Sequence, residues 1–274
     1  MSAFTHGRSG SADGRDAVAL ATRGASLDAR GSGARSAGLL AALLAALLLA
    51  SLFAIATSAQ GATVGSRVQL GTFCTETGET GGRCGAARGV AVNRSGVGGV
   101  DPGTVYIANF LNRRIEQFSE GEFVRAFGWD VVASGENDVG VGFEICEADS
   151  DPVDVCKQGL QVPDPGAISN TEDVVVDPQT GNVLVADNGG AAGKRISVYS
   201  ATGEFQAAFG IGVQTGAPSL ELCTATTGCQ AGTASVAAGG LSNLLKAALA
   251  VDPVSGNLFV GERGTRRVSE FSFT

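Results

Sequence analysis

One stretch of sequence decides the fold: residues 173–212, which read DVVVDPQTGNVLVADNGGAAGKRISVYSATGEFQAAFGIG. Apolar residues alternate in its first run, and the segment DPQTGN at 177–182 then provides strong turn chemistry. A second apolar run follows at 183–185, a third opens with Arg195, and a fourth ends at Phe209. Short alternating runs separated by turns predict four antiparallel β-strands.

The same pattern occurs three times along the chain, which is the signature of a repeat architecture. Residues 89–129 and 248–274 align with the stretch above. The equivalent valines are Val92, Val176 and Val251, spaced 84 and then 75 residues apart. A repeated unit of four antiparallel strands is typical of a β-propeller blade. The sequence therefore predicts an all-β fold of about three propeller-like blades, arranged as a partial or open propeller.

The order of residues within each unit also resembles a known family. The pattern G-V-A-V-D-P-x-(S/T)-G-N-V-Y-V-A-D-x-x-N-x-R-I-x-V-F is similar to the NHL repeat, and residues 177–199 match it well. Asn109 and Glu262 depart from the pattern at the place where Asp187 gives the usual acidic residue. The resemblance implies an NHL-type β-propeller of the secreted bacterial kind. It says more about fold than about activity, because propellers carry many unrelated functions.

The segment before the repeats has a different character. Residues 1–37 are rich in Gly, Ser, Ala and Arg, which predicts a disordered leader. Residues 38–59 carry no charge and are mostly Leu and Ala, and small residues follow them. We read 38–61 as a signal peptide, with an uncleaved signal anchor, a transmembrane helix, as the alternative. The upstream Arg residues keep the N-terminus inside, so the repeat domain at 62–274 is expected to be secreted or held outside the membrane.

Composition and charge restrict the class of partner. The hydrophobic content of 44% and charged content of 17% exclude a disordered chain, and the 41 glycines suit many short strands joined by turns. The net charge is −8, and the first 61 residues contain five Arg but only three Asp, so the repeat domain is more acidic than the whole chain. An acidic domain is poorly suited to the phosphate backbone, so we expect no nucleic-acid partner.

Six cysteines form three local pairs, one in the insert that precedes each first strand. The pairs are Cys74 with Cys84, Cys146 with Cys156, and Cys223 with Cys229. An even count outside the cytosol predicts disulfides, and the repeat symmetry favours these pairings among the fifteen that six cysteines allow. Metal binding by thiolates is the alternative, but the spacing is not C-x-x-C and no histidine lies nearby.

The three inserts are expected to project from one side of the fold, and long ordered loops on a scaffold are where binding usually occurs. The middle insert is the most acidic, and the candidate ligand-face residues are Trp129, Glu147, Asp149, Asp151 and Asp154. Clustered carboxylates would suit Ca²⁺. A solvated acidic loop is the preferred reading, because no complete calcium-loop pattern is present. Trp129 is expected to pack under the insert, with ligand anchoring as the alternative.

The repeat domain contains no histidine, since His6 in the leader is the only one in the chain. This excludes a Ser-His-Asp triad and imidazole-ligated zinc there. The acidic residues at predicted strand ends and turns are Asp173, Asp177, Asp187, Asp252 and Glu262. We expect them to cap turns or to pair with arginines such as Arg195 and Arg267. No catalytic, cofactor-binding or metal-binding residue is assigned from the sequence.

The sequence therefore predicts an extracytoplasmic, non-catalytic binding module that contacts an extracellular protein or carbohydrate. No cofactor is expected, and the membrane is contacted only through residues 38–59 if they are not cleaved. Two alternatives stay open. One is a calcium-dependent, lactonase-like hydrolase that uses carboxylates at a central channel. The other is a truncated fragment of a larger propeller.

Closure of the predicted propeller is a separate question. The third unit ends after its third strand, and residues 66–71 resemble the fourth strand of a preceding unit, so the two ends could together complete one blade. Closed propellers typically have about four to eight blades. A truncated chain or an open arc is therefore expected, and a homodimer in which two copies form one ring is the third reading, since unpaired strand edges invite pairing.

Overall fold

A computed structural model describes residues 69, 71–190 and 193–273. The chain divides into two compact units, 1–67 and 68–274, and only the second is described. The predicted leader and signal segment, and nearly all of the predicted strand at 66–71, lie outside the described residues. Within the described part every regular element is a β-strand, which confirms the all-β prediction. The described residues contain no helix long and apolar enough to cross a membrane.

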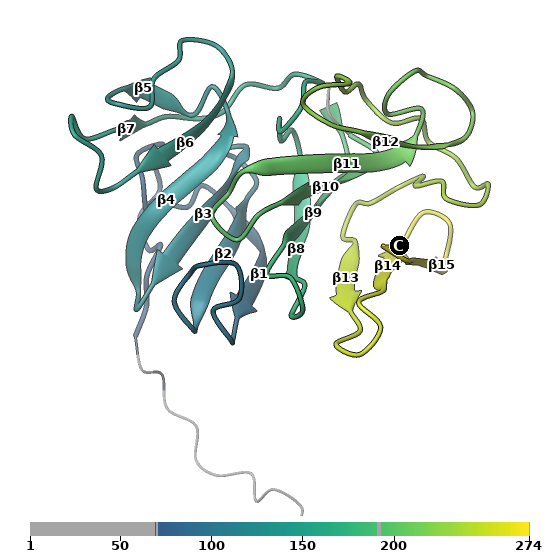
Figure 1. Ribbon diagram of the computed structural model, residues 1–274, viewed down its shortest axis with the longest axis horizontal. Helices are drawn as coiled ribbons and strands as arrows, with labels where there is room; N and C mark the ends of the chain where they lie inside the picture. Colours follow the sequence, from purple (N-terminus) through teal and green to yellow (C-terminus); the bar gives the residue numbers. More distant parts are fainter. Residues whose placement is uncertain (1–68, 70, 191–192, 274) are drawn as a thin grey trace, which may run out of the picture. The chain divides into compact units, whose positions relative to one another are not determined.

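The strands form three antiparallel sheets and one small two-stranded ribbon (Figure 1). Sheet 1 contains β1 (Ala87–Asn93), β2 (Thr104–Asn109), β3 (Arg114–Ser119), β4 (Glu122–Trp129) and β6 (Phe143–Glu147). Sheet 2 contains β8 (Thr171–Val176), β9 (Val183–Asp187), β10 (Arg195–Tyr199), β11 (Phe205–Ile211) and β12 (Leu220–Cys223). Sheet 3 contains β13 (Ala248–Val251), β14 (Leu258–Glu262) and β15 (Arg267–Phe271), and the ribbon pairs β5 (Val132–Ser134) with β7 (Val155–Cys156).

The strand count per sheet differs from the sequence prediction of four. Sheets 1 and 2 each have five strands, because the following insert adds one. The added strand β6 pairs with β4 from Arg125–Glu147 to Trp129–Phe143, and β12 pairs with β11 in the same way. The sequence FEICE at 143–147 alternates apolar and polar residues, and this period suits an edge strand with one covered face. Sheet 3 has three strands, as the sequence of the third unit predicted.

The turns between first and second strands follow the predicted chemistry. The Asp177 carboxylate accepts hydrogen bonds from the Gln179 N–H at 2.9 Å and the Thr180 hydroxyl at 2.6 Å. Asp252 accepts the equivalent bonds in the third unit, from the Val254 N–H and from Ser255. These side chains mimic a backbone turn and fix the register of the first hairpin in the second and third units. In Figure 1 these turns lie along the lower side of the unit, and the second and third inserts lie along the upper side.

The sheets stack face against face through two buried clusters. We call the two faces of each sheet the A face and the B face. The A face of sheet 1 meets the B face of sheet 2, and the first cluster contains Ala91, Tyr106, Ala108, Ile115 and Phe127 from the former and Val174, Val176, Val183 and Val185 from the latter. The A face of sheet 2 meets the B face of sheet 3 in the second cluster, with Leu184, Ala186, Ile196 and Phe209 opposite Leu249, Val251, Leu258 and Val260.

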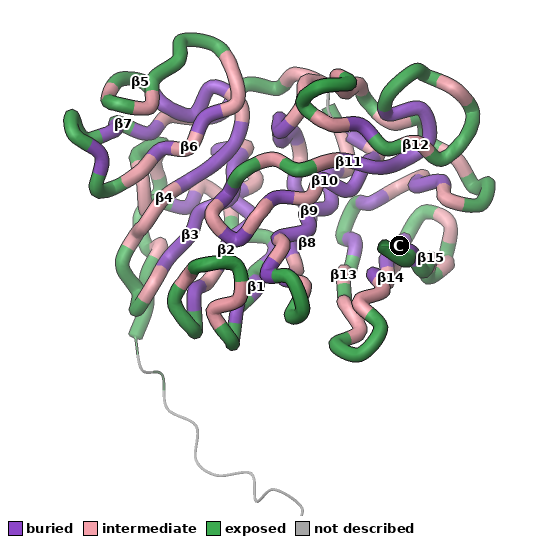
Figure 2. Tube along the Cα trace, viewed as in Figure 1, coloured by how far each residue is buried: buried purple, intermediate pink, exposed green. Residues whose placement is uncertain are grey.

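Sheet 2 is therefore covered on both faces, and its central strand β9 is buried along its whole length (Figure 2). All five residues of β9 are buried, which explains the continuous apolar run Val183–Val185 in the sequence. At the seam with sheet 1 the Tyr106 hydroxyl donates to the Ala201 carbonyl at 2.6 Å. Gly203 in the same turn has a φ of 97°, and a Cβ there would lie 2.6 Å from the Phe127 ring. Only glycine fits this turn against its neighbour.

Candidate functional site

Each unit holds its insert in place with one arginine at the start of its third strand. The Arg114 side chain is fully buried and donates to the carbonyls of Glu79 at 2.6 Å and Thr80 at 3.0 Å, in the insert before β1. It also donates to the Lys157 carbonyl at 2.6 Å, in the next insert. The guanidinium has five donors in a rigid fork, so one side chain can satisfy several loop carbonyls.

The other two arginines repeat this arrangement. Arg195, also fully buried, donates to the carbonyls of Pro163, Asp164 and Ala167 before β8, at 2.6, 3.0 and 2.8 Å. Arg267 donates to the carbonyls of Val236 and Gly240 before β13. We call Arg114, Arg195 and Arg267 the clamp arginines. The sequence predicted ion pairs for Arg195 and Arg267, and the structure adds that all three arginines fix the inserts through backbone carbonyls.

Each unit has a buried carboxylate near its clamp arginine, but the residue that supplies it does not occupy the same repeat position in all three units. Glu262 forms an ion pair with Arg267 at 2.8 Å, as the sequence predicted. Asp187 instead accepts the backbone N–H groups of Ser169 at 2.6 Å and Asn170 at 2.9 Å. Burial raises the pKa of Asp187, against the effect of these hydrogen bonds and of the nearby Arg195.

The first unit has no acidic residue at the equivalent position, which Asn109 occupies. Glu116, two residues after the clamp arginine, supplies the carboxylate there. It forms an ion pair with Arg114 at 2.7 Å, and both side chains are fully buried. The equivalent residues in the other units, Ser197 and Ser269, carry no charge.

Disulfides close each insert in the predicted pairing. The bonds join Cys74 to Cys84, Cys146 to Cys156 and Cys223 to Cys229, with Cα–Cα distances of 5.3, 5.6 and 5.3 Å. The described residues include no free cysteine. Three local disulfides are typical of proteins from an oxidising compartment. Each bond limits the conformations of a loop that has little core of its own.

The middle insert, residues 130–167, is organised around one buried carboxylate. Asp154 accepts hydrogen bonds from the Asn137 N–H at 3.1 Å, the Asn137 amide at 2.8 Å and the Glu147 N–H at 2.9 Å. Burial alone would raise the pKa of Asp154, but these donors hold it below its usual value. Asp154 thus joins β6 to the loop before it and is part of the scaffold of the insert.

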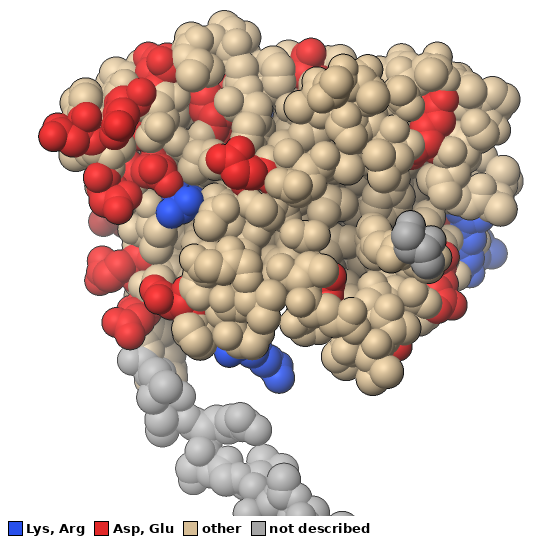
Figure 3. Space-filling model, viewed as in Figure 1, with Lys and Arg blue, Asp and Glu red and all other residues tan. Residues whose placement is uncertain are grey.

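A pocket of about 330 Å³, which we call the insert pocket, lies between this insert and the β10–β11 turn of sheet 2. Val139, Phe143 and Ile145 form its apolar part. Its charged lining consists of Arg125, Glu136, Glu144, Glu147 and Glu204. Arg125 forms an ion pair with Glu147 at 3.0 Å and donates to the Thr202 carbonyl at 3.1 Å, which connects the two walls. Figure 3 shows acidic side chains gathered over the middle insert, at the left of the view.

The carboxylates of this pocket differ in how deeply they are buried and in whether they accept hydrogen bonds from the protein. Glu144 is buried and accepts the N–H groups of Val132 at 2.7 Å and Val139 at 3.0 Å. Burial raises the pKa of Glu144 despite these bonds. Glu204 is exposed, and its carboxylate has no partner among the described residues. The pocket therefore offers an excess of negative charge beside an apolar surface.

The predicted ligand-face residues do not all lie in this pocket. Glu147 lines it, whereas Asp154 is committed to the scaffold. Asp149 and Asp151 are exposed. Trp129 is half-buried at the end of β4, where it pairs with Phe143 of the insert strand. The preferred reading that Trp129 packs under the insert stays a prediction.

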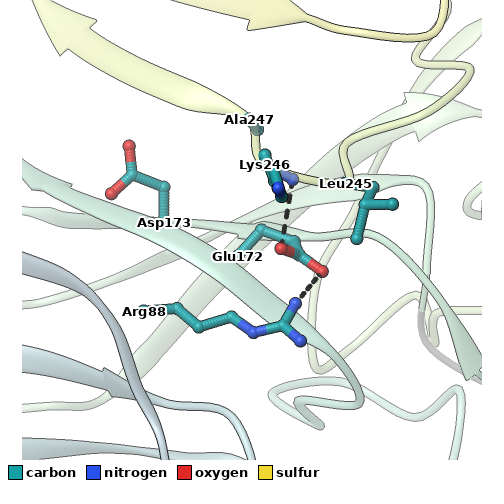
Figure 4. Close-up of a pocket in the computed structure, with 6 residues that line it drawn as sticks. All are labelled: Arg88, Glu172, Asp173, Leu245, Lys246 and Ala247. Carbon is teal, nitrogen blue, oxygen red and sulfur yellow. Dashed lines mark hydrogen bonds and ion pairs between the residues drawn. The ribbon is translucent and has the colours of Figure 1, made fainter.

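A second pocket, of about 420 Å³, lies where the first strands of the three sheets approach one another (Figure 4). Glu172 is 3% exposed and forms an ion pair with Arg88, and its second oxygen accepts the Lys246 N–H at 3.1 Å. Arg88 also lies over the Phe110 ring. Asp173 points away from this group and accepts the Leu249 N–H at 2.8 Å. The two carboxylates join neighbouring strands and do not converge on a common point.

Among the described residues no group of three or more His, Cys, Asp or Glu side chains is placed to bind a metal ion. The five acidic residues at predicted strand ends and turns all accept hydrogen bonds from the protein itself. They are Asp173, Asp177, Asp187, Asp252 and Glu262.

Sequence reasoning missed several residues that matter here. Arg125 and Glu204 reach the insert pocket from β4 and from a turn of sheet 2, so only the packing of the sheets brings them together. The Arg88–Glu172 pair could have been predicted from the repeat. The two residues are 84 positions apart, as are Val92 and Val176, so they occupy equivalent positions in adjacent units. Repeat-equivalent positions of opposite charge in adjacent units are candidates for contact.

Comparison with known proteins returned no identification. No model of a known protein family matches the sequence. No curated protein matches it either.

Proposed function

We propose that this protein is an extracytoplasmic, non-catalytic binding module built from NHL-type propeller blades, and that it binds a positively charged segment of an extracellular protein in the insert pocket. One observation carries the proposal. The middle insert is fixed by a disulfide, by a clamp arginine and by Asp154, and so holds an apolar surface beside four glutamates. A rigid loop on a scaffold loses little conformational entropy on binding.

The chemistry of the pocket selects the ligand class. Val139, Phe143 and Ile145 suit the aliphatic stem of Lys or Arg, and the glutamates around them suit its charged head. Glu204 is the most available carboxylate, since it is exposed and has no protein partner among the described residues. Arg125 is held by Glu147 and would repel a second cation, so the ligand charge is expected on the Glu136 and Glu204 side.

The extracytoplasmic location rests on two features. The three disulfides fit an oxidising compartment. The hydrophobic segment at 38–59 is the expected export signal. The resemblance to NHL repeats is supported by the three-fold repeat of turn, clamp arginine and apolar strand, whose sheets stack face to face.

Binding can be tested with the full chain, expressed with export so that the disulfides form. The probe is a fluorescent synthetic peptide of alternating Arg and Leu, compared with an alternating Glu and Leu peptide by anisotropy. We expect only the basic peptide to bind, with affinity that falls as salt rises. Glu204→Gln with Glu136→Gln should weaken binding by about tenfold, which is roughly 1.4 kcal/mol.

The matched control is Glu122→Gln, which removes an exposed carboxylate of β4 outside the insert pocket. It should leave the affinity unchanged. Equal binding of both peptides, or an unchanged affinity in the Glu136 and Glu204 variant, would refute the proposed ligand class. A polysaccharide that competes with the basic peptide at high salt would point to carbohydrate instead.

A further inference from the structure

A third pocket, also of about 420 Å³, lies at the other ends of the first strands, and we call it the turn pocket. One repeat position supplies an apolar residue from each sheet, with Val92 of β1, Val176 of β8 and Val251 of β13. The strand ends and the turns that follow them, along the lower side of Figure 1, supply the rest. These lining residues are Asn93, Arg94, Ser95, Pro178 and Pro253.

The wall from the first unit differs from the other two in charge. Pro178 and Pro253 follow the turn aspartates of the second and third units, and Arg94 occupies the equivalent position in the first unit. The aspartate before it is replaced by Asn93. The first unit therefore places a guanidinium, with no carboxylate next to it in the sequence, where the other units place an apolar ring.

The Arg94 side chain is exposed and forms no ion pair or hydrogen bond with any other described residue. The carboxylates of the three turns are engaged elsewhere. Asp177 and Asp252 accept hydrogen bonds within their own turns, and Asp101 accepts the Ser119 hydroxyl at 3.0 Å. None of these three aspartates lines the turn pocket. Arg94 thus presents an uncompensated positive charge beside an apolar surface.

Contacts between the turns hold the walls of the pocket in place. The side-chain amide of Gln179 donates to the carbonyls of Pro253 at 3.2 Å and Val254 at 2.8 Å, which joins the second unit to the third. The first turn lies against Gly181, where a Cβ would lie 2.1 Å from the Val97 carbonyl oxygen. Because the three turns support one another, a ligand would pay little conformational entropy to order them.

We propose that the turn pocket binds a small amphipathic carboxylate, with its apolar body against the valines and prolines and its carboxylate on Arg94. A guanidinium can donate two parallel N–H groups to one carboxylate, which makes this a favourable pair. The domain is acidic as a whole, but charges farther away than about 8 Å are largely screened at physiological salt. The site is separate from the insert pocket, whose glutamates favour a ligand of the opposite charge.

Octanoate and octanol are suitable probes, because they have similar apolar chains and differ in charge. We expect titration calorimetry on the exported full chain to show octanoate binding about tenfold tighter than octanol, which is roughly 1.4 kcal/mol. The affinity for octanoate should fall as the salt concentration rises, since the ion pair with Arg94 is partly exposed to solvent. The affinity for octanol should show no such fall.

Two substitutions separate the charged part of the site from its apolar part. Arg94→Gln should reduce the affinity for octanoate to that for octanol and leave octanol binding unchanged. Val92→Ser should weaken both ligands by a similar factor, because it removes an apolar contact that they share. Both side chains are exposed, Val92 by 45%, so the fold should be retained, which circular dichroism checks.

The matched controls are Arg263→Gln and Val90→Ser. Arg263 is exposed and has no ion-pair partner among the described residues, and Val90 of β1 is 66% exposed. Neither residue lines the turn pocket, so both controls should keep the wild-type affinities. Octanoate that binds no tighter than octanol, or that binds Arg94→Gln as well as wild type, would overturn the proposal. An equal loss in Arg263→Gln would also overturn it, since it would indicate attraction to overall charge.

Discussion

The side-chain amide of Asn109 donates a hydrogen bond to the Glu116 carboxylate at 3.0 Å, and that carboxylate is the one paired with Arg114. In the third unit the acidic residue at the Asn109 position, Glu262, pairs with its clamp arginine directly. The carboxylate that pairs with the clamp arginine therefore lies on the third strand in the first unit and on the second strand in the third unit. Both units thus keep an ion pair with the clamp arginine, although the carboxylate comes from different strands.

This exchange predicts a rescue. Glu116→Ser should destabilise the protein by about 3–5 kcal/mol, because it leaves a buried guanidinium without its carboxylate. Adding Asn109→Asp should recover part of that loss, since it places a carboxylate where the second and third units have one. Urea denaturation of the wild type, both single variants and the double variant measures the coupling. Additive effects of the two substitutions would contradict the exchange.

Asp154 predicts a pH dependence of known sign. Its pKa is lowered in the folded protein, so its carboxylate stabilises the fold fully above the unfolded pKa of about 3.9, and the contribution is lost as the pH falls through the folded pKa. Asp154→Asn should cost about 1–3 kcal/mol at pH 7, where charged acceptor bonds are lost. The difference from wild type should shrink steadily as the pH is lowered below about 4, measured by denaturation at each pH. A pH-independent difference would exclude this role.

Removing single disulfides should separate effects on peptide binding from effects on stability. Cys146→Ala with Cys156→Ala opens the middle insert, and Cys223→Ala with Cys229→Ala opens the third one. Each loss should lower stability by about 2–3 kcal/mol, because both bonds close short loops. Only the first pair should weaken binding of the basic peptide, as the insert pocket lies in the middle insert. Equal loss of binding in both variants would move the site away from that insert.

The Arg88–Glu172 pair predicts weaker attachment between the first strands of neighbouring sheets. Glu172→Gln removes the buried charge that Arg88 and the Lys246 N–H both contact. We expect a loss of about 1–3 kcal/mol, as for a hydrogen-bonded charged group. Arg88→Gln should cost less, because the Arg88 side chain is 32% exposed and water can replace part of its contact. Thermal unfolding of both variants would show the order, and the reverse order would contradict the buried role of Glu172.

Much of the fold could be predicted from local pattern. Alternating valines, Asp-Pro turns and three equivalent arginines gave the strands, their order within each unit and the cysteine pairs, because these depend on short-range chemistry. The fifth strands were not predicted, since FEICE at 143–147 lies inside a long insert and has no counterpart in the repeat pattern. The insert pocket was found only in part. Glu147 and its acidic neighbours are adjacent in sequence, but Glu204 is brought to them by the packing of sheet 2 on sheet 1.

The clamp arginines bind their inserts through carbonyl oxygens of the main chain, at Glu79, Thr80 and Lys157 for Arg114. A main-chain carbonyl is the same whichever side chain its residue carries. The surface residues of the inserts can therefore change without loss of these attachments. The contacts that hold each insert are thus separate from the side chains that the insert exposes, and substitutions on its surface can change its chemistry without releasing it from the sheet.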